Sequence, residues 1–154
     1  MANRLVKFDF DPLEDLDVTL KPSDKKELLG LIADYVHESI LSDVGDSVSP
    51  VTGREFKKLS KQYAEREHDG DRTSHLELEG DLLDSIKVTP IGSKIRATVD
   101  ESEQPKADGH NNFTGKSKLP RRPFIPDEKR GEDFRSSIKK GIKEIIDDFL
   151  LGLE

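Results

Sequence analysis

The sequence predicts an α+β fold, in which a small antiparallel sheet with a hairpin packs against two or three helices and a long extended loop precedes the C-terminal helix. Three observations support this class. Apolar and polar residues alternate in short runs near the N-terminus and again over 86–99, as in half-buried strands. Stretches over about 24–42 and 132–151 place apolar residues three and four positions apart, as in amphipathic helices. These stretches do not alternate as in a doubly wound sheet.

The N-terminal region contains two predicted strands and a predicted helix. Alternating apolar residues over 6–10 and over 16–20 predict the strands, and an intervening Asp-Pro pair separates them. Ser23 is a suitable N-cap for a helix over about 24–42, and acidic residues in the first turn favour a helix N-terminus. We therefore expect a strand, a second strand and a long helix in this order.

Shorter elements follow in the middle of the chain. A narrow amphipathic helix is predicted from three apolar positions spaced three and four residues apart, which are Phe56, Leu59 and Tyr63. The stretch 80–86 predicts a single helical turn. It leads into residues 86–99, where two alternating runs around a Gly-Ser pair predict a hairpin.

Residues 100–131 show no sustained periodicity, and such a long loop is uncommon in a compact domain unless it has a function or is disordered. We therefore expect a single domain over 1–154 with a protruding loop or arm at about 100–131. A helix over about 132–151 closes the chain. Its apolar stripe could pack on the chain's own sheet, whereas its last turn is apolar most of the way around and could contact another subunit.

Composition limits the classes of function. Only 32% of the residues are hydrophobic and 37% are charged, so the core is thin and a partner is expected to add stability. The net charge of −7 disfavours general nucleic-acid binding. The absence of cysteine excludes disulfides and thiolate zinc sites. No stretch approaches the roughly 20 apolar residues that span a bilayer, so we expect a soluble protein without membrane contact.

No residue pattern indicates catalysis. His68 and His75 lie near several carboxylates, but in a polar loop they match no common metal-ligand spacing. Asp81 and Asp84 share a predicted helix face, as solvated acids commonly do on an acidic chain. A G-x-S-x-G serine motif and a phosphate-binding glycine loop are also missing from the sequence. We expect no enzyme, no metal and no cofactor, and a metal-dependent hydrolase that used the two histidines with His110 stays a third alternative.

The segment KLPRRPFIPDE, residues 118–128, opens basic and closes acidic. Its arginines beside Phe124 could pair with and stack on nucleic acid, so a small nucleic-acid-associated factor using the basic 116–122 segment is the alternative function. A polyproline ligand and a flexible linker are further readings, although the prolines are irregularly spaced for the former. Three prolines stiffen an extended chain, which favours an arm that docks on a neighbouring chain and pairs its arginines with carboxylates.

Three passages together resemble one family. In SPVTGREFKKLSKQYAERE the matching positions are Ser49, Pro50, Gly53, Phe56, Leu59, Tyr63 and Ala64. In LELEGDLLDSIKV they are Gly80, Leu83, Ser85 and Ile86. In HNNFTGKSKLPRRPFIP they are His110, Phe113, Gly115, Leu119, Pro120, Arg122, Pro123 and Phe124. Their order and spacing resemble the phage virion morphogenesis and tail-completion proteins of the Mu-type and related neck families. The stretch from His110 to Gly115 is longer than the family's compact element, and the first 45 residues match no part of the pattern.

The resemblance implies a structural virion protein of a tailed bacteriophage that acts in tail completion or head-tail joining. It implies a homo-oligomeric ring, expected to be a hexamer, that assembles in the host cytoplasm and resides in the tail or neck of the virion. Expected partners are connector or neck proteins and tail-tube or tail-terminator proteins, while DNA passes through the lumen without specific binding. In this account the arm contacts partners through His110, Phe113, Leu119, Pro120, Arg121, Arg122, Pro123 and Phe124, and the motif Gly80, Leu83, Ser85 and Ile86 is structural.

Overall fold

The computed structural model describes residues 6–56, 81–111 and 122–153, and it confirms the α+β class. The strands are β1 (Lys7–Phe10), β2 (Ile86–Ile91) and β3 (Lys94–Val99). The α-helices are α1 (Pro22–Gly45), α3 (Asp81–Asp84), α4 (Gln104–Asn111) and α5 (Ser136–Gly152), and two short 3₁₀ helices are η1 (Glu101–Glu103) and η2 (Glu128–Arg130). The helix predicted after Phe56 lies outside the described residues.

The three strands form one antiparallel sheet in the order β1-β3-β2. β2 and β3 form the predicted hairpin, and Gly92 in its turn has a φ of 59°, a left-handed conformation that glycine adopts without steric cost. β2 contains Pro90, which is tolerated because β2 is an edge strand. β1 pairs with the other side of β3, from Lys7 opposite Thr98 to Phe10 opposite Ile95.

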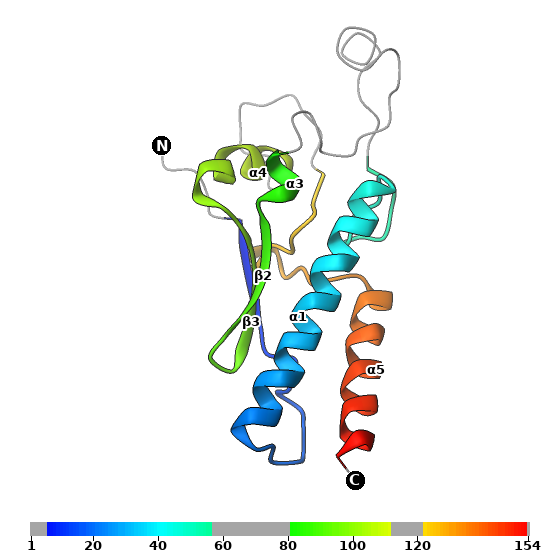
Figure 1. Ribbon diagram of the computed structural model, residues 1–154. Coiled ribbons are helices and arrows are strands. Elements are labelled where there is room, and N and C mark those ends of the chain that lie inside the picture. Colours follow the sequence, from blue (N-terminus) through cyan, green and yellow to red (C-terminus); the bar gives the residue numbers. More distant parts are fainter. Residues whose placement is uncertain (1–5, 57–80, 112–121, 154) are drawn as a thin grey trace, which may run out of the picture.

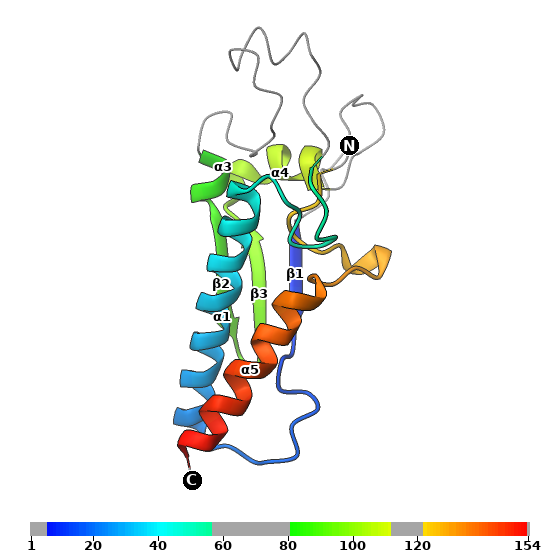
Figure 2. The ribbon, with the colours of Figure 1, turned by 90° about the vertical axis from the view of Figure 1, so that its right-hand side faces the viewer.

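Two long helices cover one face of this sheet (Figure 1). Figure 2 shows α1 and α5 side by side in front of the strands. The face of α1 that carries Leu28, Ile32 and Val36 is fully buried against the sheet, since all three side chains have 0% exposure. α1 begins at Pro22, where a missing N–H costs no hydrogen bond, so the prediction of Ser23 as the N-cap is wrong.

An aromatic cluster connects the start of the last helix to the first strand. The rings of Phe8 and Phe10 stack with centroids 5.7 Å apart. Phe134 meets both of them edge-on, at 5.6 Å from Phe8 and 5.9 Å from Phe10. Edge-to-face contacts of this kind stabilise a fold by more than the burial of their apolar area alone. The cluster therefore fixes where the chain enters α5, two residues before its first turn.

The second predicted strand, over 16–20, is wrong. Turns occupy residues 12–15, and the following residues up to α1 are not part of the sheet. Leu20 packs against the core, whereas Val18 is 56% exposed. Alternation produces a strand only where a partner strand supplies hydrogen bonds, and in the described part of the chain the one strand paired with β1 is β3.

The predicted aperiodic loop over 100–131 is also corrected, because η1, α4 and η2 lie within it. α4 has the sequence QPKADGHN, whose polar composition hides a helix from a search for apolar periodicity. Pro105 is its second residue, a position where proline is compatible with a helix start. Ala107 is fully buried and Gln104 is buried, so the helix packs on the sheet through few side chains.

Gln104 attaches α4 to two strands through its side-chain amide. Its Oε1 accepts a hydrogen bond from the Val6 backbone N–H at 2.8 Å. Its Nε2 donates to the Val99 carbonyl at 3.1 Å and to Thr98 Oγ1 at 3.3 Å. These bonds satisfy backbone groups at the end of the sheet where both β1 begins and β3 ends.

Replacement of Gln104 by alanine is expected to lower the free energy of unfolding by about 1–3 kcal/mol, because buried backbone groups of Val6 and Val99 lose their partner. The shift of the urea unfolding midpoint measures this loss. Glu101→Ala in the neighbouring 3₁₀ helix changes an exposed side chain and is the matched control, expected within about 0.5 kcal/mol of the wild type. Equal midpoints for the two variants would show that the amide contacts are unimportant.

Candidate interaction surfaces

Two passages of the resemblance meet directly in the fold. Ser49 lies in the turn after α1, and its Oγ donates a hydrogen bond to the Pro123 carbonyl at 2.5 Å. The same Oγ accepts from the backbone N–H groups of Val51 and Thr52, both at 3.1 Å. One buried hydroxyl thus organises its own turn and holds the PRRPFIP segment against it.

The PRRPFIP segment lies inside the chain where it is described. Phe124 and Ile125 have 0% exposure and Arg122 has 2%, and Pro123 is buried as well. Figure 1 shows this stretch running from the α4 end of the sheet toward the start of α5. The prediction of a protruding arm with Arg122, Pro123 and Phe124 as anchors for a neighbouring subunit is therefore wrong for these three residues. These residues pack on their own chain, where Phe124 and Ile125 belong to the hydrophobic core and the Pro123 carbonyl accepts from Ser49.

Most of the other residues of that prediction are not among the described ones. Phe113, Leu119, Pro120 and Arg121 lie outside the described residues, as does Gly80. His110 belongs to α4 by its backbone, and its side chain lies outside the described part. The basic segment 116–122 is described only at Arg122, which is buried.

The structural motif before the hairpin is an ordered junction. Ser85 Oγ donates to the Leu82 carbonyl at 2.7 Å and so closes the turn after α3. The Ser85 carbonyl accepts from Asp100 N–H at 3.1 Å, which joins the two ends of the hairpin. His37 Nε2 of α1 donates to the Ile86 carbonyl at 3.1 Å, and Leu83 packs against the core. The α3 turn was predicted correctly. The side-chain hydrogen bond of Ser85 explains the serine after it, and burial of the Ile86 side chain at 2% exposure explains the isoleucine.

The first turn of α5 is tied to the last turns of α1 by an ion pair. Arg135 donates from Nε and Nη2 to the two carboxylate oxygens of Asp43, each at 2.8 Å. Its backbone N–H also donates to the Pro50 carbonyl at 2.8 Å. The hydrogen bond to Asp43 raises the pKa of Arg135, against the lowering effect of burial. Sequence patterns did not reveal this pair, because 92 residues separate its members.

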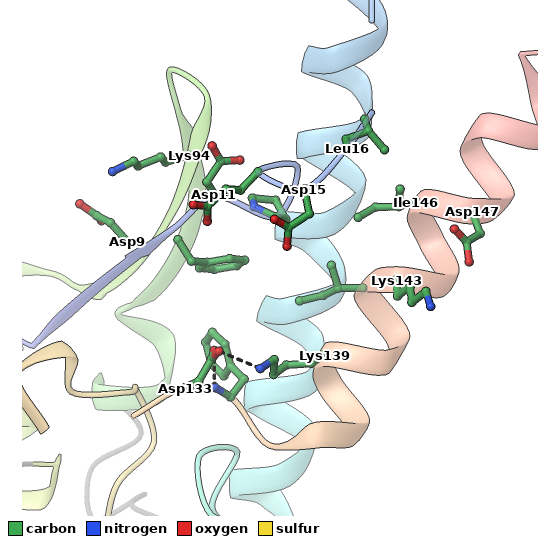
Figure 3. A pocket seen from close by; sticks show the side chains of 15 residues that line it. Asp9, Asp11, Asp15, Leu16, Lys94, Asp133, Lys139, Lys143, Ile146 and Asp147 are labelled. Carbon is green, nitrogen blue, oxygen red and sulfur yellow. Dashed lines mark hydrogen bonds and ion pairs between the residues drawn. The ribbon is translucent and has the colours of Figure 1, made fainter. Parts of the chain in front are cut away.

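A groove of about 840 Å³ lies between the loop after β1 and α5 (Figure 3). Its floor and walls include apolar residues such as Phe10, Leu16 and Ile146. Carboxylates from the loop and lysines from α5 lie around it, and Lys139 pairs with Asp133 at 3.1 Å. In the described residues no group of three or more histidine or acidic side chains is placed to hold a metal ion. The lining of this groove thus combines apolar side chains with charged groups of both signs.

A second ion pair lies on the sheet. Arg96 of β3 donates from Nε and Nη2 to Asp9 of β1, at 2.8 and 3.1 Å. The hydrogen bond from Arg96 lowers the pKa of Asp9, opposed by burial and assisted by the charges of Arg96, Lys7 and Lys94. Asp9 and Arg96 lie directly opposite each other in the register, so this pair connects β1 with β3.

The lowered pKa of Asp9 makes stability depend on pH. A carboxyl with a lower pKa in the folded chain contributes stability that is fully present above the unfolded-state value near 4 and is lost as pH falls through the folded value. Asp9→Asn is therefore expected to flatten the loss of thermal stability below about pH 4. The exposed Asp17→Asn is the control and should keep the wild-type slope. The same slope in both variants would contradict this role of Asp9.

No helix in the described residues is long and apolar enough to cross a membrane. Comparison of the chain with protein-family models, with curated proteins and with solved structures finds no match.

Proposed function

We propose that this chain is a structural virion protein of a tailed bacteriophage, which acts in tail completion or head-tail joining as an oligomeric ring at the neck. The observation that carries the proposal is the placement of the resembling residues. Ser49 and Pro123, from passages far apart in the sequence, are joined by one buried hydrogen bond. Ser85 closes the turn that starts the hairpin. Both hydrogen bonds stabilise turns of this fold, and structural roles at the resembling positions support the proposal.

The surface of α5 supports a contact with other subunits. Leu151 is 65% exposed and Leu153 is 47% exposed at the C-terminal end of this helix. Ile138 and Ile142 on earlier turns are buried, whereas Leu151 lies nine residues after Ile142 and so on the opposite side of the helix. The C-terminal end of α5 therefore exposes apolar groups outside the buried stripe, and exposed apolar groups that lie together are typical of interaction sites. We propose that this end of α5 contacts a second copy or a neck protein.

The PRRPFIP segment has a revised role in this proposal. Because Phe124 is fully buried, it is an intramolecular anchor that connects the turn after α1 to the start of α5. Partner contacts through connector, neck, tail-tube or tail-terminator proteins are proposed for exposed surfaces instead. The charge of −7 suits a ring through which DNA passes without specific binding, because like charges repel phosphates.

A joining assay tests the proposal. The gene for this chain is deleted from a tailed phage that normally encodes it, and heads and tails are prepared from the deletion strain. Purified chain is then added to them. Electron microscopy then counts joined particles, and we expect the purified chain to restore joining. Deletion particles that join equally well without the chain would contradict the proposed function, and so would particles that stay separate at a saturating amount of folded chain.

A further inference from the structure

The sheet has one face that turns away from α1 and α5 (Figure 1). Lys7, Thr98 and Lys87 lie next to each other in one row across the three strands of this face. Asp9, Arg96 and Thr89 form the next row. The apolar residues of the strands alternate with these and face the helices. Gln104 of α4 contacts this face at Thr98.

This sheet face, defined as Lys7, Lys87, Thr89, Lys94 and Arg96, has an excess of positive charge. The side chains of Lys7 and Lys87 are 43% and 59% exposed, and that of Arg96 is 34% exposed. Figure 3 shows Lys94 together with Asp9 on the side of the sheet away from α1. Asp9 and Asp100 pair with some of these cations, which leaves cations in excess on a chain whose net charge is −7.

The acidic loop, residues 11–17 between β1 and α1, has the opposite character. Its acids are Asp11, Glu14, Asp15 and Asp17, and its sequence has no lysine or arginine. Leu13 N–H donates to Asp11 Oδ1 at 3.0 Å and Leu16 N–H donates to the Leu13 carbonyl at 3.1 Å. These bonds give the loop a set shape, so little ordering cost is expected when a partner binds it.

We propose that the sheet face of one copy binds the acidic loop of a second copy of this chain. The charges are complementary, and each surface has an exposed apolar residue at its end, Ile91 at 42% on the sheet and Val18 at 56% after the loop. A nucleic acid is a poorer occupant, since β1, β2 and β3 present no aromatic side chain on this face for base stacking. This contact joins two different surfaces of the chain. Each copy can therefore bind one neighbour through its sheet face and another through its acidic loop, and such a head-to-tail arrangement can close into a ring. The inference thus rests on the proposed ring and names its interface.

Thr89 allows a matched pair of variants on the sheet face. It is exposed, and it lies beside Arg96 in the register, so both a glutamate and a lysine fit there without burial. Thr89→Glu, combined with Lys87→Glu, is expected to weaken self-association at least roughly tenfold by opposing the acidic loop with like charge. Thr89→Lys, combined with Lys87→Arg, changes the same two positions but retains the sign of the face, and it is expected to associate as well as the wild type. Sedimentation of the full chain measures the mass in each case.

The reciprocal variant carries Glu14→Lys and Asp15→Lys in the acidic loop, and it too is expected to lose self-association. Mixing it with the glutamate variant of the sheet face is expected to restore the wild-type mass, because each face then meets a loop of opposite charge. Raising the salt from about 0.1 M to about 1 M should weaken the wild-type contact by screening. Restoration by mixing supports the contact, since neither surface change alone can produce it.

Three results would overturn the inference. The first is a wild-type mass for both reversed variants, which leaves the proposed function intact if the joining assay still succeeds. The second is failure of the mixture to associate while circular dichroism shows that both variants are folded. The third is a glutamate variant that keeps the wild-type mass but loses binding to a short DNA duplex that the wild type binds. The sheet face would then be a nucleic-acid surface.

Discussion

Replacement of Phe124 by alanine is expected to lower the free energy of unfolding by about 3–5 kcal/mol, because it empties a fully buried site in the core. On a chain with few apolar residues this is a large share of the total stability. Urea unfolding monitored by circular dichroism measures the change. Phe124→Leu fills most of the volume and is expected to cost less, about 1.5 kcal/mol or below.

The same substitution distinguishes a role of Phe124 in the core of its own chain from a role in contact with a neighbouring subunit. If Phe124 docked on a neighbouring subunit, alanine would reduce oligomer mass and leave the unfolding of the isolated chain unchanged. Leu31→Ala, at a residue 46% exposed, is the control and is expected to change stability by no more than about 0.5 kcal/mol. An unchanged unfolding midpoint for Phe124→Ala at a protein concentration where the chain is monomeric would contradict the anchor.

Gly141→Ala is expected to lower the free energy of unfolding by about 1–3 kcal/mol, although alanine favours a helix. Gly141 of α5 lies against the Tyr35 ring of α1, and an added Cβ would come within 1.9 Å of the Tyr35 hydroxyl oxygen and 2.3 Å of Cζ. Because ring atoms as well as the hydroxyl are too close, the whole side chain must move or the helices must separate.

Gly30→Ala in α1 is the matched control, since a Cβ there meets no atom within 4 Å. It is expected to raise stability by up to about 1 kcal/mol through helix propensity alone. In a Tyr35→Ala background, Gly141→Ala should lose its cost, because the clash has been removed. Equal effects of the two glycine changes in the wild-type background would show that Tyr35 does not limit the approach of α1 and α5.

Parts of the fold that depend on local periodicity were predictable. The apolar positions of α1 and α5 and the alternation in the hairpin follow directly from burial on one face. The observed ends of the helices differ from the predicted ends by several residues, since α1 extends over Pro22–Gly45 and α5 begins at Ser136. Pro22 and the contacts of Arg135 determine these ends, and contacts between distant residues leave no local pattern.

The candidate site was predicted less well. Prolines and arginines around Phe124 were interpreted as an exposed arm, because a polar, aperiodic stretch is usually on the surface. Phe124 and Ile125 are apolar enough to fill the core, and Ser49 receives the segment through a single hydroxyl. The sheet face was missed because its cations come from three strands that only the register brings together. A plot of charge on alternate strand residues would have revealed it.

The proposed function requires that this chain associates with itself. Sedimentation equilibrium of the full chain over a range of concentrations measures this association. At high concentration we expect a closed assembly whose mass is a fixed multiple of the single chain, with six copies for the expected hexamer. A mass equal to one chain at every concentration, for protein with native circular dichroism, would contradict it.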